Sequence, residues 1–208
     1  MPKVQADGLP LPQRYGAILT IVIGISMAVL DGAIANVALP TIATDLHATP
    51  ASSIWVVNAY QIAIVISLLS FSFLGDLFGY RRIYKCGLVV FLLSSLFCAL
   101  SDSLQMLTLA RVIQGFGGAA LMSVNTALIR LIYPQRFLCR VMGIISFIVA
   151  VSSAAGPTIA AAILSIASWK WLFLINVPLG IIALLLAMRF LPPNGSRASK
   201  PRFDLPSA

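Results

Sequence analysis

The stretch YGAILTIVIGISMAVLDGAIANVAL, residues 15–39, decides the fold class of this chain. It contains one charged residue, Asp31, in a run longer than the roughly 20 residues that a helix needs to cross the hydrocarbon core of a bilayer. A helix on the surface of a soluble protein keeps one polar face for water, and this run is apolar around its whole circumference. We therefore expect residues 15–39 to span a membrane, with Pro40 ending the helix.

The composition of the rest of the chain agrees with a membrane protein. The 208 residues are 60% hydrophobic and 10% charged, and the mean hydropathy is +0.99. Soluble domains carry about 25% charged residues, because they must cover their surface with polar groups. The sequence predicts an all-α integral membrane protein with a six-helix bundle at residues 15–191 and tails at residues 1–14 and 192–208. The five further spans are expected at residues 55–75, 83–100, 104–128, 137–164 and 169–191.

Basic residues gather on one side of the membrane when the gaps between spans are assigned to alternate sides. That side also holds both termini, and only Lys170 falls on the other side. Loops with an excess of Lys and Arg stay in the cytoplasm. We therefore expect both termini in the cytoplasm and the protein in a bacterial inner membrane. The basic residues on the cytoplasmic side are Lys3, Arg14, Arg81, Arg82, Lys85, Arg130, Arg136, Arg140, Arg189, Arg197, Lys200 and Arg202.

Two other functional classes fit the sequence poorly. Nucleic-acid binding would need a basic domain, whereas the basic residues here flank apolar spans. An intramembrane serine protease would need a histidine base within a span, and the one histidine, His47, lies in a predicted outer loop. The sequence shows no metal-binding or cofactor motif, so we expect no nucleic-acid partner, no enzyme activity and no cofactor.

Charged residues inside apolar spans are costly, so they indicate functional positions. Asp31 lies eight residues before the outer end of its span at Leu39, or about 12 Å along a helix. Arg111 lies seven residues after the outer start of its span at Leu104, or about 10 Å. The two charges are therefore expected at nearly one depth. Three amides are candidates beside them: Gln61 at a similar depth, Asn36 nearer the outer face and Gln114 about one turn deeper.

Two interpretations of this pair remain open from the residues alone. Asp31 and Arg111 could form a static salt bridge that joins two helices, although a buried pair seldom stabilises a protein more than apolar residues do. Alternatively, Arg111 could move relative to Asp31 and thereby change how readily the carboxylate holds a proton. A cationic solute near Asp31 would compete with that proton, which would permit exchange of protons against cations.

Five segments, in this order, resemble the signatures of the fourteen-span drug:proton antiporters of the major facilitator superfamily. They cover much of the chain, and their shared order makes the resemblance far more specific than any single segment does. The segments are LDGAIANVALPTI (residues 30–42), SFLGDLFGYRR (72–82), LARVIQGFGGA (109–119), AAGPTIAA (154–161) and WKWLFLINVPLGI (169–181).

The resemblance implies roles for individual residues. Asp31 and Arg111 would serve proton coupling and proton transfer, with Gln114 in the same motif. Gly156 and Pro157 would form the kinked, closely packed antiporter helix that seals against ion leak. Asp76, Gly79, Arg81 and Arg82 would form a cytoplasmic gating loop. The sequence departs from the family pattern at Ser72, Leu77, Tyr80, Ser152, Ala160 and Ala161.

The resemblance also implies that this chain corresponds to one half of a transporter. Six spans match the N-terminal half of a major facilitator fold, which consists of two three-helix inverted repeats. The expected function is proton-coupled export of lipophilic, cationic compounds, with a proton as the coupling ion. The expected partners are the lipid bilayer, the substrate, and a C-terminal half or a second copy of the chain. The alternative is a truncated membrane fragment that does not transport by itself.

Overall fold

The computed structural model describes residues 8–193. Within them all regular structure is helical, and six helical segments are long and apolar enough to cross a membrane. This confirms the predicted fold class, while residues 1–7 and 194–208 of the two predicted tails lie outside the described residues. The elements are α1 (Leu11–Asp45), α2 (Pro50–Ser53), α3 (Trp55–Phe78), α4 (Tyr80–Ala99), α5 (Leu104–Ile132), η1 (Gln135–Phe137), α6 (Leu138–Leu164), α7 (Lys170–Leu174) and α8 (Asn176–Phe190).

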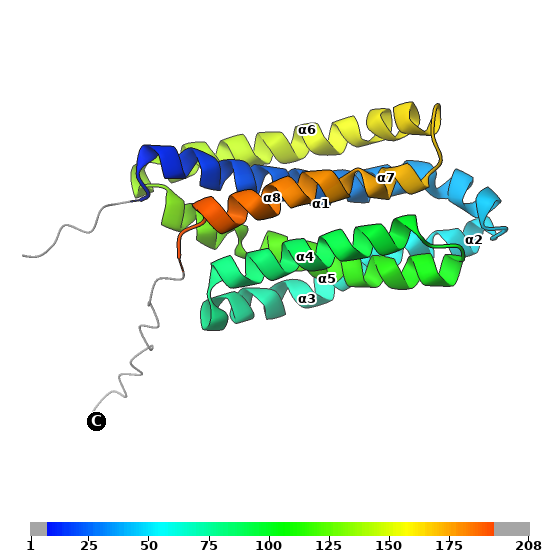
Figure 1. The fold of residues 1–208 in the computed structure, drawn as a ribbon, viewed down its shortest axis with the longest axis horizontal. Coiled ribbons are helices and arrows are strands. Elements are labelled where there is room, and N and C mark those ends of the chain that lie inside the picture. Colours follow the sequence, from blue (N-terminus) through cyan, green and yellow to red (C-terminus); the bar gives the residue numbers. More distant parts are fainter. Residues whose placement is uncertain (1–7, 194–208) are drawn as a thin grey trace, which may run out of the picture.

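The helices lie side by side in two groups (Figure 1). In one group, α5 packs against both α3 and α4, and in the other α1 packs against both α6 and α8. The groups meet where α1 contacts α5 and where α4 contacts α7 and α8. The start of α1 and the end of α8 lie at the same end of the bundle (Figure 1), as an even number of crossings requires.

The predicted end of the first span at Pro40 was wrong. The helix α1 continues through Pro40 to Asp45, because a membrane interior offers no water to the backbone groups that a broken helix would expose. The sixth span is two helices, α7 and α8, which meet at Ile175. Pro178 has no N–H to donate to the carbonyl of Leu174, so the regular hydrogen-bond ladder is interrupted at this joint.

Local sequence explains several helix ends. The Thr49 side chain accepts a hydrogen bond from the Ser52 backbone N–H at 3.2 Å and so caps α2. Ser103 caps α5 in the same way through the N–H of Met106, at 3.3 Å. Gly79 has a φ of +93°, which side-chain-bearing residues rarely adopt, and it separates α3 from α4.

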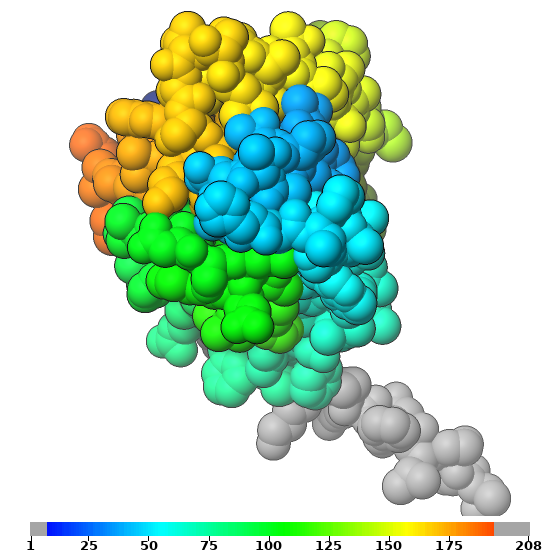
Figure 2. All heavy atoms as spheres, turned by 90° about the vertical axis from the view of Figure 1, so that its right-hand side faces the viewer, coloured from blue at the N-terminus to red at the C-terminus, as the bar shows by residue number. Residues whose placement is uncertain are grey.

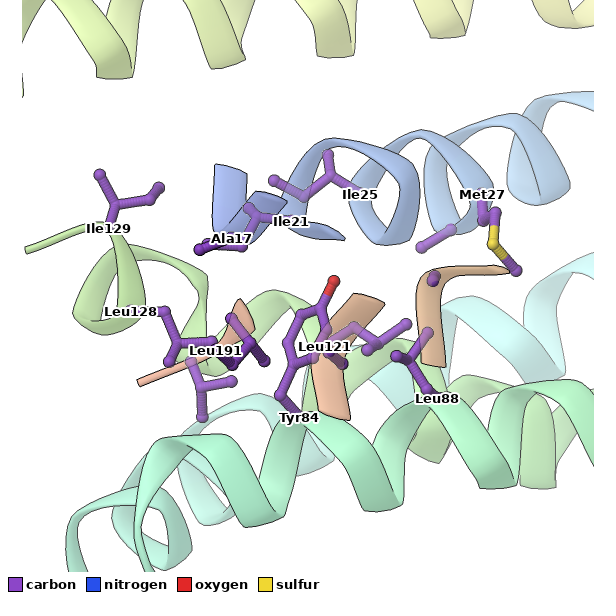
Figure 3. Close-up of a cluster of buried hydrophobic side chains, with 14 of the residues drawn as sticks. Ala17, Ile21, Ile25, Met27, Tyr84, Leu88, Leu121, Leu128, Ile129 and Leu191 are labelled. Atoms are coloured by element: carbon purple, nitrogen blue, oxygen red, sulfur yellow. The ribbon is translucent and has the colours of Figure 1, made fainter. Parts of the chain in front are cut away.

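The apolar core consists of two clusters, one in each half of the bundle along its length. The inner cluster lies toward the end that holds the start of α1 and the end of α8, and it includes Ile21, Tyr84, Leu88 and Leu128. In Figure 3 the Tyr84 side chain extends from α4 toward α1, and its hydroxyl donates a hydrogen bond to the Thr20 carbonyl at 2.8 Å. The outer cluster includes Ile34, Ile42, Val56, Leu107, Trp169 and Phe173.

The end of the bundle opposite to the start of α1 is shown in Figure 2, where the connection from α1 to α3 lies between the α4–α5 turn and the α6–α7 turn. Trp169 is only 1% exposed there. Its indole N–H donates a hydrogen bond to the Asp45 carboxylate at 2.7 Å, so Trp169 packs inside the bundle and joins α7 to the end of α1. Lys170 and Asp102 form an exposed ion pair beside it, at 2.9 Å.

Candidate functional site

A layer of polar side chains separates the two apolar clusters. On α1, the inner cluster extends to Ala28 and the outer cluster begins at Ile34, with Asp31 between them. The same order holds along α4 and α5, and along α7 and α8 taken together. We define the polar layer as Asp31 on α1, Ser95 on α4, Arg111 and Gln114 on α5, and Asn176 on α8, all of which are buried.

The Asp31 carboxylate accepts hydrogen bonds from three side chains and is 3% exposed. Its Oδ2 atom pairs with the Nη1 group of Arg111. Its Oδ1 atom accepts from the amide of Gln114 at 3.0 Å and from the amide of Asn176 at 2.8 Å. A buried carboxylate needs such donors, because transfer of an unpaired charge out of water is strongly unfavourable.

The Arg111 guanidinium has further partners that do not depend on Asp31. Its Nε group donates to the Val56 carbonyl at 3.1 Å, and Nη1 also donates to Gln114 Oε1 at 2.6 Å. The guanidinium carbon lies 4.0 Å from the ring centroid of Tyr60 and 5.6 Å from that of Phe173, within the range of cation–π attraction. Nη2 has no hydrogen-bond partner among the described residues.

Gln114 connects the charged pair to α4. Its amide nitrogen donates to Ser95 Oγ at 2.8 Å as well as to Asp31. Its amide oxygen lies 3.6 Å from the Cys98 sulfur, which donates a weak hydrogen bond to it. The polar layer is therefore one connected network that joins four helices, α1, α4, α5 and α8.

Two glycines on α5 allow its neighbours to approach the layer closely. A Cβ atom at Gly115 would lie 2.7 Å from the Tyr60 carbonyl oxygen on α3. A Cβ atom at Gly117 would lie 2.7 Å from the Phe91 backbone nitrogen on α4. These backbone atoms move only if a whole helix moves, so the two glycines determine how near α3 and α4 lie to Arg111 and Gln114.

The structure brings some of the predicted coupling residues together and leaves others apart. Asp31, Arg111 and Gln114 are in direct contact, which the similar depth of Asp31 and Arg111 permits but does not require. Gln61 and Asn36 are exposed at the surface of the bundle. The Asn36 amide donates to the Gly32 carbonyl of its own helix at 2.9 Å. Depth along a helix does not say which side of the helix a residue occupies, and a coupling role for Gln61 and Asn36 stays a prediction.

The predicted gating residues lie at the end of the bundle that holds the start of α1. The hydroxyl of Tyr80 donates to the Asp76 carboxylate, so a residue that departs from the family pattern supplies the partner of this acid. Arg81 donates to the Met188 carbonyl in the last turn of α8, where a cation is favourable. Arg82 is exposed. A gating role for these residues stays a prediction.

Of the two predicted antiporter residues, Gly156 lies on the side of α6 that meets α1. A Cβ atom at Gly156 would lie 2.5 Å from the Ala33 Cβ atom, so glycine permits close contact between the two helices. Pro157 is exposed, and α6 continues through it. Ser152 is one of the positions at which the sequence departs from the family pattern, and its hydroxyl donates to Ser26 Oγ at 3.3 Å.

Sequence reasoning missed Asn176, Ser95 and Tyr60 as members or neighbours of the network. The depth rule could have found Asn176, which lies seven residues after the start of its predicted span at Trp169, or about 10 Å. Ser95 gives no comparable signal, because hydroxyls in spans commonly bond to their own helix. The position of Tyr60 over the guanidinium follows only from the packing of α3 on α5.

The sequence profile of the Major Facilitator Superfamily matches residues 21–207. The chain is 98% identical over 208 residues to the uncharacterized transporter YebQ of Escherichia coli strain K12, covering all of this chain and 46% of that protein. It is 34% identical over 196 residues to the riboflavin transporter RibZ of Clostridioides difficile, covering 94% of this chain and 43% of RibZ.

Two further matches concern a resistance protein and a solved structure. The chain is 37% identical over 186 residues to the putative multidrug resistance protein MdtD of Salmonella paratyphi B, covering 89% of this chain and 39% of MdtD. The crystal structure of a bacterial homologue of the human lysosomal transporter Spinster, inward-facing and unoccupied, superposes with a TM-score of 0.68 at 18% identity. That match covers 90% of this chain and 45% of the other.

The chain thus spans less than half the length of each of these curated relatives. The family match extends over most of the sequence, and the solved structure shares the arrangement of the helices. Six apolar helices and this family together identify a multi-pass membrane protein. The chain belongs to the major facilitator superfamily of membrane transporters.

Proposed function

We propose that this chain forms half of a proton-coupled exporter of lipophilic, cationic compounds, related to the fourteen-span multidrug antiporters. The observation that carries the proposal is the buried Asp31 carboxylate, held between two apolar clusters in a membrane protein. An ionisable group at such a position is expensive, and in transporters it marks a coupling site. The similarity to MdtD supports a drug substrate, whereas RibZ shows that the relatives differ in what they transport.

In the proposed cycle, Asp31 takes up a proton when the cationic substrate leaves and releases it when the next substrate approaches. A proton on Asp31 Oδ2 makes this oxygen a hydrogen-bond donor. It then no longer accepts the hydrogen bond from Nη1 of Arg111. Arg111 would still be held by Gln114 and by the Val56 carbonyl, and it would remain over the Tyr60 ring. The network would therefore tolerate both charge states of Asp31 without leaving a buried cation unpartnered.

Transport is proposed to require a second six-helix half, as the share of the relatives that the chain spans suggests. Polar side chains on α1 and α3, including Asn36, Asn58 and Gln61, are exposed on the surface of this bundle. Contact with lipid tails would be unfavourable for such groups, so we expect a second half to cover them. Both termini are proposed to face the cytoplasm.

The test uses this chain joined to the remaining half of the 98% identical YebQ protein, in inside-out membrane vesicles. Addition of tetraphenylphosphonium, a lipophilic cation, should drive proton movement in the wild type. Asp31→Asn should reduce that movement at least tenfold, because an amide does not exchange a proton in this pH range. Asp102→Asn is the matched control, since Asp102 forms only an exposed pair with Lys170, and such pairs contribute little.

Unchanged proton movement in the Asp31→Asn protein would overturn the proposed role of Asp31. The alternative, a fragment without transport activity, has its own test. Cells that express the 208-residue chain alone should retain tetraphenylphosphonium as strongly as cells without it, and cells that express the joined protein should retain less. Equal retention in all three would favour the fragment.

A further inference from the structure

Asn176 contacts the Asp31 carboxylate from α8, a helix that has no charged residue near Asp31. The side chain is 4% exposed, and its Nδ2 atom lies 2.8 Å from Asp31 Oδ1. It is the first residue of α8, directly after the joint at Ile175, where Pro178 interrupts the hydrogen-bond ladder. Of the described residues, Asn176 is the only one in α6, α7 or α8 that hydrogen-bonds to Asp31.

The hydrogen bond from Asn176 affects the charge state of Asp31. An amide N–H that donates to a carboxylate stabilises the charged form, because the protonated acid is a weaker acceptor. Gln114 donates to the same oxygen, but its amide is fixed from two other sides by Arg111 and Ser95. Asn176 has no second hydrogen bond in the described residues that would hold its amide. Its contribution therefore depends on where α8 lies relative to α1.

We infer that Asn176 is a positioning residue for proton coupling: it holds Asp31 in the charged form while α8 is packed against α1, and so makes proton uptake depend on the position of α8. This inference rests on the proposed function of Asp31. The inference rests on the contact between the Asp31 carboxylate on α1 and a buried amide that lies directly after the joint between α7 and α8.

The test measures protonation of Asp31 directly. Dicyclohexylcarbodiimide reacts with protonated carboxyl groups in apolar surroundings, and mass spectrometry of the peptide that contains Asp31 gives the labelled fraction at each pH. In the protein joined to the remaining half of YebQ, Asn176→Leu should raise the pH of half-labelling by about one unit, which corresponds to about 1.4 kcal/mol. Loss of the donor favours the neutral acid, so the proton is taken up at higher pH.

Two further variants separate positioning from general structural damage. Asn176→Asp is nearly isosteric with the wild type and should raise the midpoint further, because a second carboxylate disfavours the charge on Asp31. Asn176→Asp can therefore still test the inference if Asn176→Leu does not reach the membrane. Asn125→Leu is the matched control: Asn125 is also a buried asparagine within a span, at 6% exposure, and it has no hydrogen bond to Asp31. Its midpoint should equal that of the wild type.

An unshifted midpoint in both Asn176 variants would overturn the inference, as would an equal shift in Asn125→Leu. The labelling needs neither substrate nor transport. An unshifted midpoint would therefore contradict only the positioning role of Asn176. Proton movement that persists in Asp31→Asn would contradict the proposed function.

Discussion

At the scale of single residues, the pair of Asp31 and Arg111 is the most costly feature of the bundle. Both side chains are almost completely removed from solvent. Burial of two charges rarely stabilises a protein more than apolar residues would, but removal of one partner leaves the other charge uncompensated. The contribution of the pair to stability can therefore be measured by mutation, separately from the proposed role of Asp31 in transport.

Arg111→Gln should lower stability by about 3–5 kcal/mol, because it leaves the Asp31 carboxylate without its cation. The double variant Asp31→Asn with Arg111→Gln should lose much less than the sum of the two single variants, since residues in contact are not additive. Thermal unfolding of the detergent-solubilised protein measures all three against the wild type. Additive losses would show that the two charges do not stabilise each other.

At the scale of helices, packing against α5 depends on small residues. Gly117 faces the backbone of α4, and Gly115 faces that of α3. Without an aqueous phase to drive association, helices in a membrane gain stability mainly from such close contact. The same residues place Ser95 and Tyr60 near Gln114 and Arg111, so helix packing and the geometry of the polar layer depend on each other.

Gly117→Ala should destabilise the bundle by about 1–3 kcal/mol, because the new Cβ atom would lie 2.7 Å from the Phe91 backbone nitrogen. Gly143→Ala is the matched control on α6, where a Cβ atom would have no atom within 4 Å. It should leave stability unchanged or raise it slightly, since alanine favours a helix over glycine. Thermal unfolding in detergent compares the two, and equal losses would argue against close packing at Gly117.

At the scale of the whole molecule, the two apolar clusters and the polar layer between them divide the bundle along its length. One end of the bundle holds the start of α1 and the end of α8 (Figure 1). Eight of the twelve basic residues assigned to the cytoplasm are described by the structure, while Lys3, Arg197, Lys200 and Arg202 lie outside the described residues. The predicted orientation can be tested without any transport assay.

Cys139 lies at the start of α6 and is exposed, whereas Ser168 lies at the other end, just before α7. In a chain with Cys86 and Cys98 replaced by serine, a membrane-impermeant maleimide should label Cys139 from the cytoplasmic side only. With Cys139 also replaced, Ser168→Cys should be labelled from the opposite side only. The reverse pattern would show that the termini lie outside.

The sequence by itself determined the all-helical membrane fold and the presence of six spans, because apolar length and charge placement are local properties that a bilayer selects directly. It also indicated that Asp31 and Arg111 share one depth. It misjudged the end of the first helix at Pro40, because a membrane interior favours a helix that continues without exposing backbone groups.

Only the tertiary structure decided which polar groups meet. Gln61 and Asn36 have suitable depths but lie on the surface of the bundle, while Asn176 and Ser95 complete the network. Depth along a helix can be read from residue number, whereas the direction of a side chain in the bundle depends on how each helix is rotated against its partners. That rotation is determined by contacts between distant segments, such as Gly117 with Phe91.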